Sequence, residues 1–231
     1  MNSVQLSLSQ NNKHCSIKTR YAVTGWQGEQ SMARRSDHSR DEIREMALSA
    51  AEKIVCEHGY KGFSARKVAS AIGYTVGTLY LVFDNLDDLI LQVNGRTLDR
   101  LHARMVREQA ACGQAAARLL RLGHSYIRFA NEEPHCWGMI FEHRFAQNQA
   151  TPEWFQVKVA RMFALVEAGL EPLAGNHSPQ EIAQAARALW SGVHGICILA
   201  VTDKLDVVGV DSVQDLTHYL MDNFLRGFTG S

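Results

Sequence analysis

The chain has 231 residues, of which 46% are hydrophobic and 21% are charged, and its formal net charge is zero. This is an ordinary globular composition, and the length suffices for one large or two smaller helical domains. No stretch approaches the roughly 18 uncharged apolar residues that a membrane-spanning helix needs, and the N-terminus lacks the apolar segment of a signal peptide. We therefore expect a cytoplasmic protein that does not enter the membrane.

Residues 1–31 are polar and have no helical or strand period. Such termini are usually disordered, because they cannot bury enough apolar surface to offset the entropy lost on folding. We expect a disordered arm over residues 1–38. The functional alternative is a basic arm that reaches the minor groove of DNA.

Two predicted helices frame the next part of the chain. Ser39 and Glu42 have the spacing of a capping box, and the apolar residues after them keep a 3.6-residue period until Gly59, which can end the helix. Farther along, Asn85 and Asp88 can begin a long second helix with the same apolar period.

Between these helices the sequence predicts a helix, a glycine turn and a very short helix. Apolar side chains recur at three-and-four spacing over residues 64–72. Gly73 allows the positive φ of a sharp turn, and the Thr75 hydroxyl can cap a helix over residues 76–81. A short helix with small side chains on its exposed first turn suits the major groove of DNA. The pattern therefore predicts a DNA-binding helix-turn-helix.

The expected DNA contacts follow from side-chain chemistry. The hydroxyls of Thr75 and Thr78 and the methyls of Val76 can contact base edges, and the Tyr80 phenol can reach a phosphate while its ring packs inward. The basic side chains nearby should attract phosphates, although such charges can also form a merely solvated surface. The predicted DNA-binding residues are Ser64, Arg66, Lys67, Thr75, Val76, Gly77, Thr78 and Tyr80.

This region resembles the TetR family of transcriptional repressors over roughly residues 40 to 100. The matching elements are A-x7-G-Y from Ala51 to Tyr60, A-x3-G from Ala69 to Gly73, G-T-L-Y-x-x-F from Gly77 to Phe83, and the pair Asp88-Leu89. The resemblance implies an all-α homodimer whose small N-terminal domain binds operator DNA and whose larger C-terminal domain binds a small molecule and dimerises. It also implies an alternative start of the chain at Met32, because family members often begin in this way.

The chain departs from the family pattern near these contacts. The family commonly has a phosphate-binding lysine where this chain has Leu86, and often a lysine or polar residue where it has Val76. Both departures reduce the number of expected phosphate contacts. Leu86 is expected either to lack such a contact or to pack as an apolar residue beneath its helix.

The second half reads as helices joined by polar turns, over residues 115–131, 134–145, 152–171, 179–201 and 212–228. The helix over 179–201 is apolar nearly all round, so we expect it to be buried on most faces. Its W-x-G-x-H-G motif, from Trp190 to Gly195, resembles a C-terminal variant of the same family. Small residues such as Gly192 and Gly195 allow close approach, and with the last helix they would form a four-helix dimer interface.

Large aromatic side chains come from several of these helices. They are first of all core residues, but a domain of this size with many rings often encloses an apolar pocket. For His194 the ordinary interpretation is a hydrogen-bonded core histidine, and the alternative is a pocket residue. The predicted pocket residues are Tyr126, Trp137, Phe141, Trp154, Trp190 and His194.

The sequence gives little support for disulfide bonds, a metal site or an enzymatic function. The five cysteines are scattered, odd in number and without a CxxC pair, which predicts free thiols in a reducing compartment. Cys136 and His143 could share a helix face, but a buried thiol and an exposed imidazole are the simpler interpretation. No nucleophile elbow, P-loop, H-E-x-x-H or dinucleotide motif occurs. We therefore expect a non-enzymatic protein without catalytic, cofactor-binding or metal-binding residues.

These features predict an all-α, nucleoid-associated regulator of transcription. Residues 39–100 would form a three-helix helix-turn-helix domain and residues 101–231 a larger ligand-binding and dimerisation domain. The expected partners are double-stranded operator DNA, a small-molecule effector that releases it, and a second copy of the chain. The alternative is an architectural, chromosome-organising factor with a filled C-terminal core. A cavity with convergent polar groups would distinguish the two.

Overall fold

The computed structural model describes residues 38–110, 113–144 and 150–230, which belong to one compact unit over Asp37–Ser231. Every regular element in these ranges is a helix, which confirms the predicted all-α fold class. None of the described helices is long and apolar enough to span a membrane. The arm expected over residues 1–38 lies outside the described residues, apart from His38.

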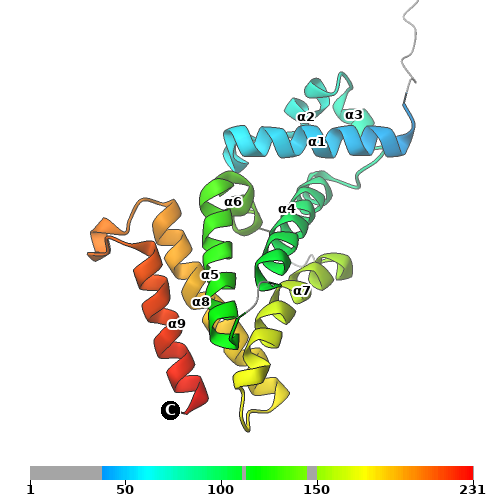
Figure 1. The fold of residues 1–231 in the computed structure, drawn as a ribbon. Helices are drawn as coiled ribbons and strands as arrows, with labels where there is room; N and C mark the ends of the chain where they lie inside the picture. The colour runs from blue at the N-terminus through cyan, green and yellow to red at the C-terminus, as the bar shows by residue number, and fades with distance from the viewer. Residues whose placement is uncertain (1–37, 111–112, 145–149, 231) are drawn as a thin grey trace, which may run out of the picture. The chain divides into compact units, whose positions relative to one another are not determined.

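The helix-turn-helix region comprises three helices and the first turns of a fourth (Figure 1). The elements are α1 (Arg40–His58), a 3-10 turn (Tyr60–Gly62), α2 (Ala65–Ala71), α3 (Val76–Leu79) and α4 (Leu86–Gln109). The predicted capping box between Ser39 and Glu42 is present, and Asn85 caps α4 by accepting from the Asp88 N–H at 2.9 Å. The short helix was predicted to reach residue 81, but it ends at Leu79.

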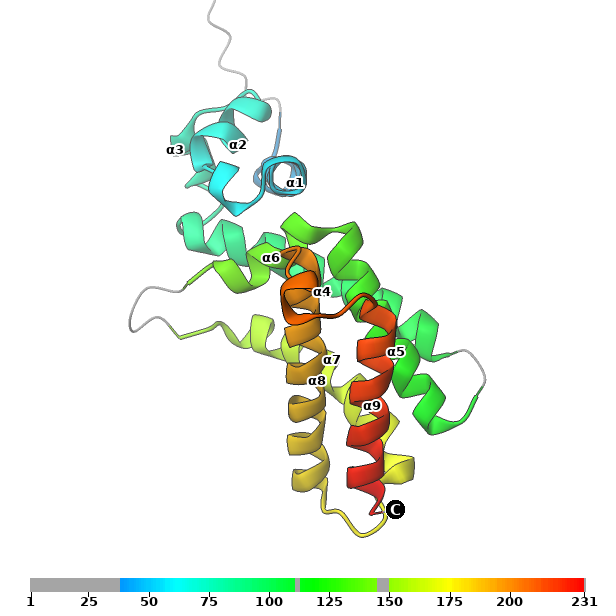
Figure 2. The same ribbon diagram turned by 90° about the vertical axis from the view of Figure 1, so that its left-hand side faces the viewer.

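In the second half, the described residues form five helices. They are α5 (Ala115–Glu132), α6 (Pro134–Glu142), α7 (Glu153–Leu170), α8 (Pro179–Val201) and α9 (Val213–Thr229), with 3-10 turns at Glu171–Leu173 and Asp206–Val208. α8 and α9 lie side by side in both views (Figures 1 and 2). The helix that begins at Pro134 was predicted to reach residue 145, but it ends at Glu142.

The interior contains two main apolar clusters. The N-terminal core consists of Ala47, Leu48, Ala51, Val55, Ala65, Val68, Ala69, Leu79, Phe83, Leu89, Ile90, Val93, Cys136 and Met139. The C-terminal core consists of Leu101, Met105, Leu119, Leu122, Tyr126, Ile127, Phe129, Ala130, Trp137, Val166, Leu170, Ala186, Leu189, Val193, Ile196, Cys197, Met221 and Leu225. α4 and α6 contribute to both clusters, so these two helices connect the two halves of the unit.

The prediction that α8 is buried on most faces is wrong. Only one stripe of α8 is buried, while Ala188, Ser191, Gly195 and Ile198 on another face are exposed. The sequence misleads here because the exposed face also carries apolar and small side chains. A helix that is apolar all round can be half-buried in a single chain when a partner covers the rest.

The prediction of free thiols is wrong for one pair. Cys56 on α1 and Cys136 on α6, 80 positions apart, form a disulfide. Cys197 is a buried free thiol, while Cys15 and Cys112 lie outside the described residues. Spacing gave no sign of the bond, because a disulfide between two helices depends on tertiary contact. The same bond excludes the Cys136–His143 metal pair, and His143 is buried beside the Tyr60 hydroxyl instead of exposed.

Candidate nucleic-acid interface and internal cavity

Hydrogen bonds within the turn fix the orientation of α3. Gly73 has φ 75° and open space around its Cα, so its role is conformational. The Thr75 hydroxyl accepts from the Thr78 N–H at 3.3 Å, as predicted, and the two hydroxyl oxygens lie 3.1 Å apart. Leu79 is only 1% exposed and anchors the helix in the N-terminal core. Thr75 and Gly77 are exposed on the side of α3 away from that core.

The structure brings the predicted DNA-binding residues together on α2, α3 and their caps. Arg66, Lys67, Thr75, Gly77 and Tyr80 are exposed, whereas the remaining three are half-buried. Of those three, Ser64 caps α2, and Val76 packs partly against the N-terminal core. The Val76 methyls are therefore only partly available to a base.

Two aromatic or apolar side chains here were not predicted. The Tyr74 hydroxyl lies 2.8 Å from His38 Nδ1, which joins the turn to the residue before the cap of α1. Leu81 follows α3 and is 64% exposed, a high value for a leucine. The only available signal for both was their position beside the predicted short helix.

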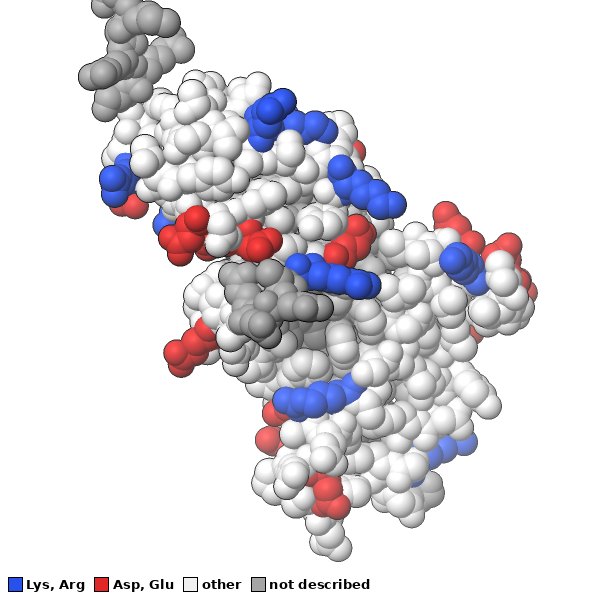
Figure 3. Space-filling model, turned by 180° about the vertical axis from the view of Figure 1, so that it is seen from behind, with Lys and Arg blue, Asp and Glu red and all other residues white. Residues whose placement is uncertain are grey.

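On the face shown in Figure 3, the lysine and arginine side chains are scattered and do not form one continuous patch. Leu86, at the position where the family commonly has lysine, packs against the N-terminal core. This packing favours the second interpretation of Leu86, as an apolar residue beneath its helix.

Ion pairs join α4 to α1 and also to the start of α6. Arg96 pairs with Glu45 and Glu52, and Arg100 bridges Glu52 at 2.6 Å and Glu133 at 3.0 Å. Each pair is partly exposed, so each contributes at most about 1 kcal/mol. Their main effect is on geometry, because together they hold α4 both to the helix-turn-helix and to the C-terminal half.

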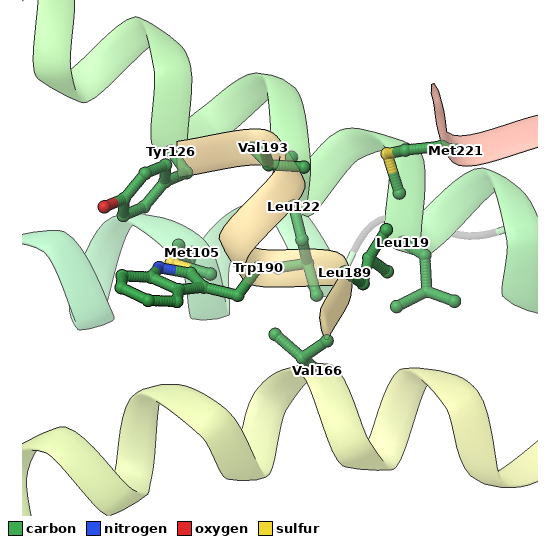
Figure 4. Close-up of a pocket in the computed structure, with 10 residues that line it drawn as sticks. Met105, Leu119, Leu122, Tyr126, Val166, Leu189, Trp190, Val193 and Met221 are labelled. Atoms are coloured by element: carbon green, nitrogen blue, oxygen red, sulfur yellow. The ribbon is translucent and has the colours of Figure 1, made fainter. Parts of the chain in front are cut away.

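The C-terminal half contains a partly open apolar cavity of about 180 Å³. Its lining residues are Leu98, Leu101, Met105, Tyr126, Trp137, Ile140, Phe141, Val159, Met162, Phe163, Val166 and Trp190. A second cavity of about 30 Å³ adjoins it and shares Met105, Tyr126, Val166 and Trp190. Figure 4 shows the residues of the smaller cavity, with Tyr126 and Trp190 near one end and Met221 near the other.

A few polar groups converge where Tyr126, Trp137 and Trp190 line the larger cavity. The Tyr126 hydroxyl lies 2.9 Å from His194 Nδ1, and the His194 ring stacks on Trp190 at 4.8 Å between centroids. Burial raises the pKa of Tyr126 and lowers the pKa of His194, so both are uncharged at neutral pH. The Trp137 indole nitrogen is buried and makes no hydrogen bond of ordinary geometry among the described residues, although it acts on the Tyr126 hydroxyl closely enough to offset part of the rise in the pKa of that group. The site thus offers neutral hydrogen-bonding groups in an apolar surround.

The predicted pocket residues are only partly at the cavity. Tyr126, Trp137, Phe141 and Trp190 line it, and His194 lies against their rings. Trp154 does not line it: this side chain is 39% exposed and packs on Gly95 of α4. The lining residues missed by prediction are mainly aliphatic side chains of α4 and α7. Their helical period was visible, but a period does not separate cavity wall from filled core.

The described fold is that of an all-α helix-turn-helix protein with a helical C-terminal half. A family model described as bacterial regulatory proteins of the tetR family matches residues 47–93, and one described as a tetracyclin repressor-like C-terminal domain matches residues 119–224. Together they cover more than half of the chain. The chain therefore belongs to the TetR family of transcriptional regulators, as its sequence resemblance implied.

Solved structures agree with this assignment at the level of the fold. A protein of unknown function from Rhodococcus sp. RHA1 is 23% identical, with a TM-score of 0.67 over 84% of this chain and 98% of that one. A tetR-family regulator from Streptomyces coelicolor is 18% identical, with a TM-score of 0.62 and 84% of each chain covered. RolR bound to resorcinol is 17% identical, with a TM-score of 0.59 over 81% and 88%. No curated protein matched this chain.

Proposed function

We propose that this chain is a homodimeric repressor that binds operator DNA through α2 and α3 and releases it when a small uncharged aromatic molecule enters the cavity. One observation carries the proposal: α4 begins directly after the helix-turn-helix, and its later residues Leu98, Leu101 and Met105 line the cavity. A molecule that displaces this helix therefore acts on the orientation of α2 and α3.

Release would follow from a shift between two states. Two recognition helices of a dimer must lie about one turn of DNA apart, roughly 34–36 Å, to enter successive major grooves. An effector lowers DNA affinity only by its preference for a state with another separation. The ion pairs of Arg96 and Arg100 couple α4 to α1, so a movement at the cavity is passed to the whole helix-turn-helix.

The cavity limits the size and charge of the effector. Its volume of about 180 Å³ is near the roughly 150 Å³ of an engineered apolar cavity that holds benzene. Among the described residues no charged side chain lines it, so a charged ligand would be buried unpaired at high cost. In the same part of the chain the Trp137 N–H makes no hydrogen bond of ordinary geometry with the described residues, so it can still donate to a ligand with one hydrogen-bond acceptor. RolR, which shares the fold, binds a one-ring diol of this kind.

The exposed face of α8, with part of α9, is the surface through which we propose that two chains form the dimer. Gly195 has open space where a Cβ would stand, and Ile198 is 40% exposed beside it on the same face. Gly192, which sequence analysis also assigned to the interface, serves another purpose. Its added Cβ would lie 2.8 Å from Leu220 of the same chain, so this glycine allows α9 to approach α8.

The alternative, an architectural factor without effector response, is less well supported. That function needs a filled C-terminal core, whereas this core contains a cavity with neutral polar groups at one end. A cavity lowers stability when it is not used. Its retention is easier to explain if a ligand fills it.

The proposal is tested in two stages with the full chain. Fragments of its own genome are selected by binding, and the enriched operator is then titrated with paired compounds that share one ring system, one neutral and one carboxylated. We expect a specific operator and release by neutral compounds only. Absence of any enriched sequence contradicts the DNA-binding function, whereas an operator that no neutral aromatic compound releases contradicts the effector response alone.

A matched pair of variants then tests whether the effector binds in the cavity. Trp137→Phe keeps the ring and removes the donor, so the effector should bind roughly 2- to 10-fold more weakly while operator affinity is unchanged. Trp154→Phe makes the same change outside the cavity and should leave the response as it is. Equal effects of the two substitutions would place the effector elsewhere.

A further inference from the structure

The Cys56–Cys136 disulfide joins a reachable sulfur to an enclosed one. Cys56 lies in the last turn of α1 and is exposed, whereas Cys136, in the first turn of α6, is 1% exposed. Their Cα atoms are 5.5 Å apart, which is the ordinary separation for a disulfide. Neither helix therefore has to move for the bond to form or break. Exposed disulfides are the labile ones, because a thiolate can reach a sulfur atom.

The disulfide ends on α6, a helix whose two faces contact different parts of the protein. Cys136 and Met139 of α6 belong to the N-terminal core, whereas Trp137, Ile140 and Phe141 line the cavity. α6 is thus the one described helix whose side chains enter both the N-terminal core and the cavity wall in adjacent positions. A covalent bond from α1 to this helix restricts its movement relative to the helix-turn-helix.

Weaker contacts hold α6 to α1 and to α4. His135 Nδ1 lies 2.9 Å from the Cys56 carbonyl oxygen, and the Asn94 amide donates to the Met139 carbonyl at 3.5 Å. These contacts would remain when the disulfide is reduced. Reduction therefore loosens the junction between α1 and α6 and does not dismantle it.

We propose that Cys56 and Cys136 form a reversible redox site for low-molecular-weight thiols and disulfides of the glutathione class, and that its disulfide form holds α6 against α1. In oxidation the Cys56 thiolate attacks a disulfide RSSR and releases one RS⁻. The Cys136 thiolate then attacks the Cys56 sulfur of the mixed disulfide and releases a second RS⁻. The two protein thiols lose two electrons to RSSR, and their two protons end on the two RSH products.

A consequence for regulation rests on the proposed function. The disulfide ties α6, whose Trp137, Ile140 and Phe141 line the cavity, to α1. A molecule that displaces α4 from within the cavity also presses on the α6 wall, so the oxidised protein resists the displacement and stays on its operator at higher effector concentrations. The reduced protein responds more readily. Redox state would set the sensitivity of the response and leave the operator sequence unchanged.

The redox site is tested on the native full chain in glutathione buffers. With excess glutathione disulfide, peptide mass analysis after alkylation should find Cys56 linked to Cys136. With excess glutathione, Cys56 should be alkylated in the native protein and the enclosed Cys136 as a free thiol once denaturant is added. Cys56→Ser should remove the cross-link, while Cys15→Ser should behave as the wild type. A pair that stays linked in excess glutathione until the protein unfolds, or never links, overturns the reversible site.

Hydrogen exchange tests whether the bond holds α6. Amides of α6 and of the last turn of α1 should exchange several-fold more slowly in the oxidised protein, and this difference should vanish in Cys56→Ser. Equal exchange in both buffers overturns the mechanical role. Operator release is measured last: a higher effector requirement in the oxidised wild type alone is expected, and equal requirements overturn the regulatory consequence. A chain that binds no operator in either buffer contradicts the proposed function but leaves the first two results intact.

Discussion

The two halves of the molecule differ in how completely they bury their apolar side chains. The N-terminal core is closed over by α1 to α4 and by two residues of α6, and every predicted cap in that half is made. The C-terminal half leaves a cavity of about 180 Å³ and an exposed apolar face on α8. A surface that reads DNA needs a rigid support, whereas a site that receives a small molecule and a partner must leave space unfilled.

The strongest test of this difference in packing removes the Leu79 side chain, which anchors α3 in the N-terminal core. Leu79→Ala deletes a side chain that is 1% exposed in the N-terminal core, so the unfolding free energy should fall by about 2–5 kcal/mol. The helix is too short to keep its place without this anchor, and operator binding should be lost well below the melting temperature. Denaturant unfolding and DNA titration at low temperature measure the two effects. Full operator affinity in a destabilised variant would show that the caps alone position α3.

A matched pair of substitutions compares the two interiors directly. Val68 of α2 is 0% exposed in the filled N-terminal core, whereas Val166 of α7 borders both cavities. Val68→Leu should destabilise by about 1–3 kcal/mol through overpacking. Val166→Leu makes the same change beside empty space and should alter stability by less than about 0.5 kcal/mol, while weakening effector binding. Equal losses of stability would mean that the two interiors are equally packed.

Much of this comparison was predictable from the sequence because it depends on local contacts. The capping box at Ser39 and the caps Thr75 and Asn85 each join residues three apart, so their chemistry can be read directly. The fold class and the set of helices follow from apolar period in the same way. Four of the six predicted pocket residues lie at the cavity wall, since large rings from different helices tend to meet; their role in binding stays a prediction.

What the sequence did not predict depends on which distant residues meet. The Cys56–Cys136 bond spans 80 positions, and Trp154 has the same chemistry as the pocket tryptophans yet packs on Gly95. Gly192 and Gly195 are three positions apart in one motif, but only Gly192 faces a neighbouring helix of its own chain. Residue type and period cannot distinguish these cases, because the distinction lies in how the helices are arranged.

The two glycines of α8 allow a test of the exposed face. Gly195→Leu places a side chain into open space, so it should leave the folded monomer intact while weakening the dimer at least about tenfold, or about 1.4 kcal/mol. Gly192→Ala serves as the contrast, because its methyl group meets Leu220 within the chain and should affect melting more than association. Sedimentation and thermal melts separate the two effects. An unchanged dimer in Gly195→Leu would exclude this face of α8 from the interface.

The smallest expected effect concerns the outer surface of the helix-turn-helix. Tyr80 follows α3 and is 46% exposed, so its hydroxyl can reach a phosphate without supporting the core. Tyr80→Phe keeps the ring and removes at most one hydrogen bond, which should weaken operator binding by roughly 0.5–1.5 kcal/mol without changing the melting temperature. Because a phosphate contact carries no base information, binding to unrelated DNA should weaken equally. A variant that melts normally and binds as tightly as wild type would assign Tyr80 a packing role, and a loss confined to the operator would mean that it reads a base.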